Sequence, residues 1–169
     1  MRRLTLVRHA KSDWKNAGLK DFDRPLNRRG LREAPQMAER LAAQDIRPDL
    51  MLTSPAVRAL ETARVFAKAL EYPLRRLKTD DRLYLAPAAD ILEVVRGVGS
   101  RVRHLMIFGH NPGLSEFAAS LTNDPALGEL PTCAVYTMEL DVRSWVDVRF
   151  GEAINASLSH PRSLLDLLR

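Results

Sequence analysis

Short apolar runs alternate with segments of helical period along the chain. The runs predict buried strands at LTLV, DLMLTS, HLMIFGH and CAVYTMELD. Apolar residues spaced three or four apart predict helices over 27–43, 54–70 and 88–98, and a fourth helix in NPGLSEFAASL. This alternation is typical of an α/β protein whose helices cover both faces of a mainly parallel sheet. We therefore expect a three-layer α/β/α sandwich.

Several details of these segments make the prediction specific. Pro35 lies inside the first helical segment and predicts a kink or a late start, because proline lacks the N–H and clashes with the preceding turn. Ser54 and Pro55 open the second segment as its cap and its first helical residue. Near the end, CAVYTMELD and SWVDVRF predict a closing antiparallel pair, and LSHPRSLLDLLR predicts a short final helix.

Composition adds limits to this picture. With 169 residues, 46% of them apolar and 28% charged, we expect one domain spanning 1–169. The apolar runs are too short for a membrane helix of roughly 18–20 residues. The start, MRRLTLVRHA, lacks the apolar core of a secretory signal, so we expect a cytoplasmic protein. A single cysteine, Cys133, excludes an internal disulfide and any multi-cysteine zinc site.

The charge balance favours anionic partners. The formal net charge is +5 and the sequence pI is about 9.8. Nucleic-acid binding would predict a basic run interleaved with aromatic residues, but the densest clusters are pairs such as Arg28-Arg29, and aromatic residues make up only 6% of the chain. We therefore expect no nucleic-acid partner.

Cationic side chains follow three of the predicted strands. Arg8 and His9 come directly after the first strand, Arg58 lies in the first turn after the second, and His110 follows HLMIFG. The carboxyl ends of parallel strands share one edge of a sheet, and ligands bind at that edge. Helix N-termini there also favour an anion. Guanidinium groups bind phosphoryl oxygens bidentately, and a histidine beside them is a candidate nucleophile because they lower its pKa.

Other phosphate machinery is absent from the sequence. Neither G-x-x-x-x-G-K-[ST], G-x-G-x-x-G nor G-x-S-x-G occurs. Cys133 is followed by Glu139 where a cysteine phosphatase would need arginine, and no apolar strand precedes the paired aspartates of Asp21-Phe22-Asp23. His104 and His110 have no carboxylate at ligand spacing, so we expect no metal site.

Three motifs, taken together, resemble the histidine phosphatase superfamily, also called the phosphoglycerate mutase-like family. LTLVRHAKSDW resembles its first strand and arginine–histidine signature, LTSPAVRALETA its second-arginine motif, and FGHNPG its second-histidine motif. The resemblance extends over essentially the whole chain. The short length and the segments RHAKSDW, DRLYLAP and FGHNPGLSEFA are most similar to the small SixA-type branch, the phosphohistidine phosphatases.

The resemblance implies a phosphoglycerate mutase-like fold and a role for each matched residue. His9 would be the phosphorylated nucleophile, and Arg8, Arg58 and His110 would hold the phosphoryl group, with no metal or other cofactor. DDRLY places Asp81 where the superfamily usually has a glutamate as general acid. Aspartate is one methylene shorter than glutamate. Ser12 is expected to cap a turn, and Thr62, His104 and Trp145 to be structural.

The shorter side chain at the general-acid position bears on the choice of substrate. An alkoxide leaving from a phosphate ester is strongly basic and needs a proton donor, whereas imidazole leaving from phosphohistidine is a much weaker base. The sequence therefore favours a cofactor-free phosphatase acting on a phosphohistidine-bearing protein of a phosphorelay type. Two alternatives stay open: a phosphatase for a small phosphate ester, and a phosphoprotein-binding module without turnover.

Overall fold

The computed structural model describes residues 1–161 and contains a six-stranded sheet flanked by helices. The strands are β1 (Arg2–Arg8), β2 (Leu50–Thr53), β3 (Lys78–Thr79), β4 (His104–Gly109), β5 (Val135–Leu140) and β6 (Ile154–Ser159). The helices are α1 (Arg28–Ala43), α2 (Val57–Ala69), α3 (Ala88–Arg96) and α4 (Gly113–Thr122). Four short 3-10 helices complete the described elements: η1 (Asp21–Asp23), η2 (Leu74–Arg76), η3 (Asp81–Leu83) and η4 (Trp145–Asp147).

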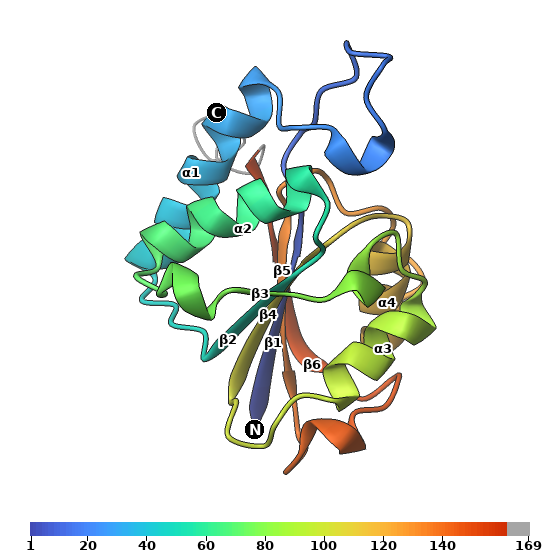
Figure 1. The fold of residues 1–169 in the computed structure, drawn as a ribbon. Helices are drawn as coiled ribbons and strands as arrows, with labels where there is room; N and C mark the ends of the chain where they lie inside the picture. Colours follow the sequence, from blue (N-terminus) through green and yellow to red (C-terminus); the bar gives the residue numbers. More distant parts are fainter. Residues whose placement is uncertain (162–169) are drawn as a thin grey trace, which may run out of the picture.

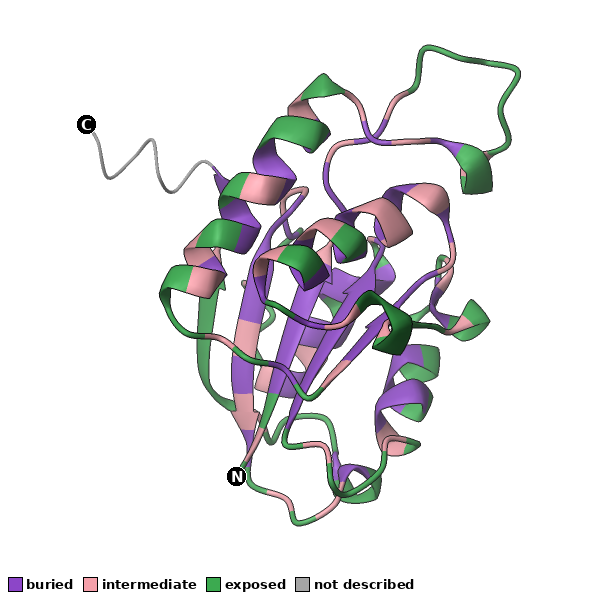
Figure 2. Ribbon diagram, turned by 60° about the vertical axis from the view of Figure 1, so that its left-hand side comes forward, coloured by how far each residue is buried: buried purple, intermediate pink, exposed green. Residues whose placement is uncertain are grey.

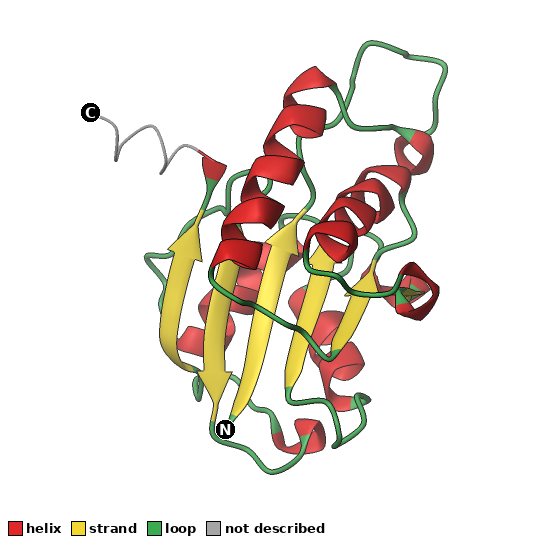
Figure 3. Ribbon diagram, turned by 90° about the vertical axis from the view of Figure 1, so that its left-hand side faces the viewer, coloured by secondary structure: helices red, strands yellow, loops and turns green. Residues whose placement is uncertain are grey.

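The sheet has the strand order β3-β2-β4-β1-β5-β6 (Figures 1 and 3). The four strands from β3 to β1 pair in parallel, and β5 pairs antiparallel with both β1 and β6. Helices α1 and α2 cover one face of this sheet, and α3 and α4 cover the other (Figure 1). The expected three-layer α/β/α architecture with a mainly parallel sheet is confirmed.

Alternation along β1 produces a core on each face of the sheet. Leu4 and Leu6 are completely buried on the side of α3 and α4, and Val7 is buried on the side of α1 and α2. Figure 2 shows the central strands buried almost along their whole length. Each fully buried leucine stabilises the fold by roughly 1.5–3 kcal/mol. The buried strands thus form a rigid support for the loops that follow them.

Two glycines let the backbone approach these loops closely. A Cβ on Gly30, in the first turn of α1, would lie 2.2 Å from the carbonyl oxygen of Lys11. A Cβ on Gly113, which begins α4, would lie 1.7 Å from the carbonyl oxygen of Ala86. Neither contact leaves room for a side chain. Glycine is therefore required where α1 and α4 begin beside the carboxyl edge of the sheet.

The structure corrects the expected start of α2. The helix begins at Val57, and its N-cap is Ala56, so Ser54 and Pro55 precede it. The hydroxyl of Ser54 accepts a hydrogen bond from the backbone N–H of Ala56 over 3.2 Å, and it also lies 2.7 Å from Nε2 of His110. Ser54 therefore forms a turn ahead of α2 and contacts His110, and it does not cap the helix.

Helix α1 starts at Arg28 with Asn27 as its cap and passes through Pro35, so of the two effects expected of this proline the late start does not occur. One expectation about the chain's course was wrong. SWVDVRF is not a strand: Trp145 is fully buried and donates from Nε1 to the carbonyl oxygen of Val102 over 2.7 Å, which holds the segment in η4. Strand β6 takes its place beside β5.

The helix expected in LSHPRSLLDLLR falls mainly outside the described residues. Within residues 1–161, no helix is long and apolar enough to cross a bilayer.

Candidate active site

A cavity of about 240 Å³ lies at the carboxyl ends of β1 and β4. Its lining comes from five separated segments of the chain, which the parallel strands bring to one edge of the sheet. The lining residues are Arg8, His9, Lys11, Ser12, Trp14, Asp21, Arg24, Arg58, Leu85, His110, Asn111 and Thr132.

Four of the five residues predicted for the site line this cavity: Arg8, His9, Arg58 and His110. The imidazole rings of His9 and His110 lie with their centroids 5.2 Å apart. Asp81 does not join them. It lies in η3 beyond the edge strand β3, its side chain is exposed, and it is not among the residues that line the cavity.

His9 presents one ring nitrogen to the cavity in an unprotonated form. Its Nδ1 lies 2.8 Å from the carbonyl oxygen of Ala10, and because a carbonyl can only accept, Nδ1 carries the proton. Nε2 then holds a lone pair, and Nε of Arg58 donates to it over 3.4 Å. Burial lowers the pKa of His9 to about 3, with the charges of Arg58, Arg8 and Arg24 acting in the same direction and the Ala10 carbonyl opposing them.

The backbone around His9 is fixed by hydrogen bonds from three elements. The N–H of His9 donates to the carbonyl oxygen of Gly109 over 3.1 Å, and that of Ala10 donates to the hydroxyl of Thr62 over 3.1 Å. The Thr62 hydroxyl itself donates to the carbonyl oxygen of Arg58 over 2.7 Å. Thr62, expected to be a structural residue, thus joins the His9 loop to the turn of α2 that carries Arg58.

His110 is held by Ser54 on the opposite side of the cavity. Nε2 of His110 lies 2.7 Å from the Ser54 hydroxyl. Nδ1 is buried and has no hydrogen-bond partner within residues 1–161. Burial lowers the pKa of His110 to about 3, with the neighbouring His9 and Arg58 contributing. Both histidines are therefore neutral at physiological pH.

Arg8 is the last residue of β1 and contributes another guanidinium group to the cavity lining. One terminal nitrogen donates to the carbonyl oxygen of Leu130 over 2.8 Å, and the same nitrogen lies 3.9 Å from the exposed carboxylate of Glu129. Its Nε is buried without a partner in the described chain. Burial lowers the pKa of Arg8, Glu129 opposes this and Arg58 adds to it. The guanidinium keeps its charge, since an arginine pKa starts so high.

Sequence reasoning missed three residues of this site: Asp21, Arg24 and Tyr84. The carboxylate of Asp21 accepts hydrogen bonds from Arg58 over 3.0 Å, from Tyr84 over 2.6 Å and from Arg24 over 3.0 and 3.2 Å. Burial raises the pKa of Asp21, but these donors outweigh it and hold the pKa well below the usual range. The available signal for Asp21 and Arg24 is the segment DFDR, which carries an acidic and a basic residue close to the first strand.

Arg24 ties the loop after β1 to the cavity. Its guanidinium lies 3.4 Å from the centroid of the Trp14 ring, a cation–π contact, and it donates to the Ser12 hydroxyl over 2.7 Å. Trp14 is 70% exposed. Arg24 itself is buried. The exposed tryptophan therefore forms part of the rim, and Ser12 helps to place Arg24.

Within residues 1–161, no group of three or more histidine, cysteine, aspartate or glutamate side chains lies close enough together to hold a metal ion. What the cavity does bring together is a lone pair on His9, a second neutral histidine and three guanidinium groups. This combination suits a tetrahedral oxyanion, because its donors can surround the anion while a nucleophile faces its centre. The fold and the cavity thus define an enzyme of phosphate chemistry.

Comparison with known proteins identifies the class more closely. A sequence model described as histidine phosphatase superfamily (branch 1) matches residues 4–84. The chain is 33% identical over 165 residues to the uncharacterized protein Rv1276c of Mycobacterium tuberculosis, which covers 92% of this chain and 100% of that protein. The chain belongs to the histidine phosphatase superfamily and is a phosphatase.

Solved structures place it in the SixA-type branch. A SixA protein of Agrobacterium tumefaciens, assigned as a phosphohistidine phosphatase, is 28% identical with a TM-score of 0.78, over 92% of this chain and 97% of that one. The protein histidine phosphatase SixA in complex with tungstate shares the fold at 21% identity, with a TM-score of 0.82 over 96% and 99% of the two chains. As a phosphatase, the protein acts on a phosphorylated substrate.

Proposed function

We propose that the protein removes phosphate from phosphohistidine in a phosphoprotein, with His9 as the nucleophile and without a metal or other cofactor. Arg8, Arg58 and His110 hold the phosphoryl oxygens during the transfer. Residues 1–169 form one catalytic domain in this proposal. Cytoplasmic phosphorelay proteins are the substrate class that this chemistry fits.

The observation that carries the substrate assignment is the lack of a usable proton donor. Asp21 is the only acidic residue lining the described cavity, and its pKa is held well below the usual range by donors from Arg24, Arg58 and Tyr84. The pKa of Tyr84 is raised, first by burial and then by its bond to Asp21. A site without an acid can expel imidazole more readily than an alkoxide. Asp81, exposed outside the cavity, receives no role in this proposal.

The reaction proceeds in two displacements. In the first, the Nε2 lone pair of His9 forms a bond to phosphorus while the P–N bond of the substrate breaks. The substrate ring already carries a proton on its other nitrogen, so the electron pair of the broken bond returns to that ring and neutral imidazole leaves. In the second, a water oxygen bonds to phosphorus, the bond to Nε2 breaks, and inorganic phosphate leaves after losing the water's proton to solvent. The proton on Nδ1, held by the Ala10 carbonyl, fixes the tautomer that both steps need.

The Agrobacterium protein supports this substrate, because it is assigned as a phosphohistidine phosphatase and is 28% identical to the chain. The guanidinium groups support the reaction type, because phosphoryl transfer is catalysed mainly by positioning and by stabilising charge on the equatorial oxygens. The comparison therefore supports the substrate class, and the guanidinium groups at the carboxyl ends of β1 and β4 support the reaction type.

Rapid-quench labelling tests the proposal. A phosphohistidine-bearing protein labelled with radioactive phosphorus is mixed with the wild type, with His9→Ala and with His104→Gln. His104 is a second buried histidine, at the opposite end of β4, so it is a matched control. We expect an acid-labile, base-stable phosphate on the wild type and on the control that turns over, and none on His9→Ala.

Other results would point to the alternatives. Phosphate release from small esters, but none from phosphohistidine, would contradict the substrate and favour a small-molecule phosphatase. Binding of the phosphoprotein without label or release would favour a recognition module. Labelling that survives in His9→Ala would contradict the nucleophile.

A further inference from the structure

Asp21 is the one negative charge among the lining of the described cavity, and its position is built from several elements. It begins η1, a short turn in the long loop between β1 and α1. One carboxylate oxygen accepts from Arg58 over 3.0 Å and from the Tyr84 hydroxyl over 2.6 Å, while the other accepts from Arg24 over 3.0 and 3.2 Å. Three donors from separate segments therefore converge on one side chain.

The contacts of Asp21 fix the orientation of Arg58. Besides the carboxylate bond, the backbone carbonyl oxygen of Asp21 accepts from the other terminal nitrogen of Arg58 over 2.7 Å. With both terminal nitrogens occupied, the Nε edge of the guanidinium is the part that faces Nε2 of His9, at 3.4 Å. The Arg58 side chain is only 3% exposed, so few other orientations are open to it. Holding a donor in place before reaction is how a site stabilises developing charge.

The same carboxylate opposes the binding of an anion. A phosphate in the cavity would share Arg58 and Arg24 with Asp21 and would be repelled by its charge. An enzyme that releases inorganic phosphate at each turnover gains from weak ground-state binding, provided that the donors needed in the transition state stay in position.

We propose that Asp21 is a positioning residue that fixes Arg58 against His9 and whose charge weakens the binding of inorganic phosphate, so that the product leaves. This inference rests on the proposed function, in which His9 carries the phosphoryl group. The long loop after β1 then takes part in turnover as well as in shaping the rim of the cavity.

The test is Asp21→Asn, with two separate measurements. Calorimetric titration with inorganic phosphate gives the dissociation constant, and steady-state hydrolysis of a phosphohistidine protein gives kcat and KM. We expect phosphate to bind about tenfold more tightly, because a like charge has been removed from a partly screened site. We expect kcat to fall about tenfold or more, because Arg58 is no longer held and the product leaves slowly.

Asp23→Asn is the matched control. Asp23 ends the same 3-10 helix, is exposed, and has no side-chain hydrogen bond or ion pair within residues 1–161. Asp23→Asn removes the same formal charge from a side chain that contacts no arginine. Both phosphate affinity and kcat should therefore match the wild type. Asp21→Glu keeps the charge and should restore the wild-type phosphate affinity while recovering part of kcat. A residue that only supported the loop would not separate the two readouts in this way.

If Asp21→Asn does not fold, Tyr84→Phe provides a second test of the proposed role of Asp21. It leaves the charge of Asp21 but removes its 2.6 Å donor, so the carboxylate repels an anion more strongly and phosphate should bind two- to threefold more weakly. Weaker phosphate binding by Asp21→Asn, an unchanged kcat, or tighter binding by Tyr84→Phe would overturn the proposal. Phosphate titration needs no substrate, so a wild type that binds phosphate yet hydrolyses no phosphohistidine would instead refute the proposed function.

Discussion

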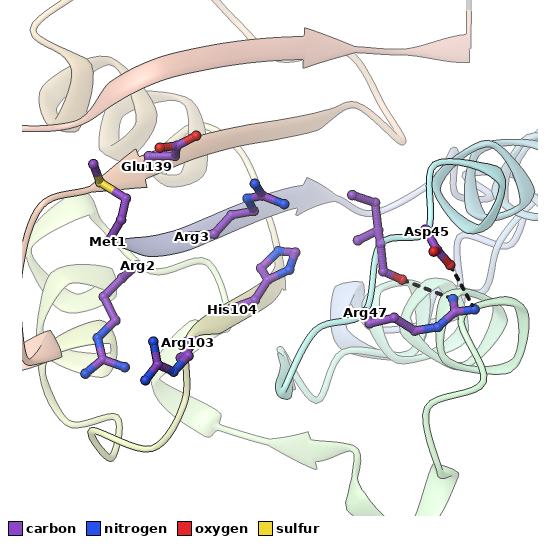
Figure 4. A pocket seen from close by; sticks show the side chains of 9 residues that line it. Met1, Arg2, Arg3, Asp45, Arg47, Arg103, His104 and Glu139 are labelled. Carbon is purple, nitrogen blue, oxygen red and sulfur yellow. Dashed lines mark hydrogen bonds and ion pairs between the residues drawn. The ribbon is translucent and has the colours of Figure 1, made fainter.

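Two hollows at opposite ends of β1 are both rich in arginine, but only one is organised for chemistry. The hollow at the amino end measures about 410 Å³ and is the larger of the two (Figure 4). Its lining residues are Met1, Arg2, Arg3, Asp45, Ile46, Arg47, Arg103, His104 and Glu139. The cavity at the carboxyl end, of about 240 Å³, holds His9 and His110 among its arginines.

The arginines of the amino-end hollow do not converge. Arg2 donates to the carbonyl oxygens of Val102 and Arg143, and Arg47 pairs with the exposed Asp45 over 3.4 Å. Figure 4 shows Arg3 pointing away from Arg2 and Arg103. At the carboxyl end, by contrast, Arg58 is buried and its nitrogens are assigned to Asp21 and His9. The two ends therefore differ in the convergence of buried, partnered donors rather than in the number of cations.

The largest effect should come from Arg58→Ala at the carboxyl end. It removes the donor facing His9 and leaves Asp21 with less neutralisation, so kcat/KM on a phosphohistidine protein should fall by about 10²–10³, the usual loss for one such donor. Arg58→Lys keeps the charge but not the fork of donors and should recover only a minor part. Steady-state kinetics check both, and a loss below tenfold in Arg58→Ala would contradict the comparison.

Acid should destabilise both ends of the sheet through buried histidines. Burial is the first cause that lowers the pKa of His104 to about 4, and of His9 and His110 to about 3, from 6.5. Between these values the unfolded chain binds more protons than the folded one, so stability present above pH 6.5 is lost as the pH falls toward 4. For His104 alone the loss is at most about 3 kcal/mol.

Denaturant unfolding at a series of pH values measures this loss. His104→Gln removes one of the three histidines, so the fall in stability between pH 6.5 and 4 should become shallower by up to about 1.4 kcal/mol per pH unit. Parallel curves for the variant and the wild type would show that His104 does not titrate in this range.

At the amino end of β1, we expect substitutions to lower the stability of the protein without changing its function. The Thr5 hydroxyl lies 2.7 Å from Nε2 of His104 and 3.1 Å from the Thr137 hydroxyl. Thr5→Val keeps the shape but leaves the buried imidazole unpaired, which should lower the free energy of unfolding by about 1–3 kcal/mol. Thr137→Val removes one contact and should cost less. Phosphate affinity should be unchanged in both, and a change of more than twofold would contradict the separation of the two ends.

The fold was predictable where the local signal and the tertiary packing agree. The runs at β1, β2, β4 and β5 are apolar and bounded by turns, and the parallel order of β1, β2 and β4 places Arg8, His9 and His110 at one edge. The prediction failed at SWVDVRF, because alternating apolar residues also suit a turn that buries one large side chain, Trp145. The exposed β6 carries little apolar signal of its own.

The site was predictable for residues in the strand-end motifs and not for residues brought in by loops. Asp21, Arg24 and Tyr84 lie in 3-10 turns or next to them, and their meeting depends on loop paths that no periodicity specifies. Asp81 was expected from DDRLY, yet the residue of that segment that reaches the site network is Tyr84, three positions further on. A short turn such as η3 points successive side chains in different directions, so a motif match there does not fix which one enters.

The smallest effect should come from the exposed arginines of the amino-end hollow. Arg103 makes no side-chain hydrogen bond or ion pair within residues 1–161, although its backbone N–H donates to Asp49 over 2.9 Å. Arg103→Ala should therefore change the free energy of unfolding by less than about 0.5 kcal/mol, as is usual for an exposed side chain without such contacts. Phosphate affinity and kcat should equal the wild-type values, measured by the same titration and assay. A loss of phosphate binding in Arg103→Ala would mean that this hollow binds anions too, and that convergence is not what separates the two ends.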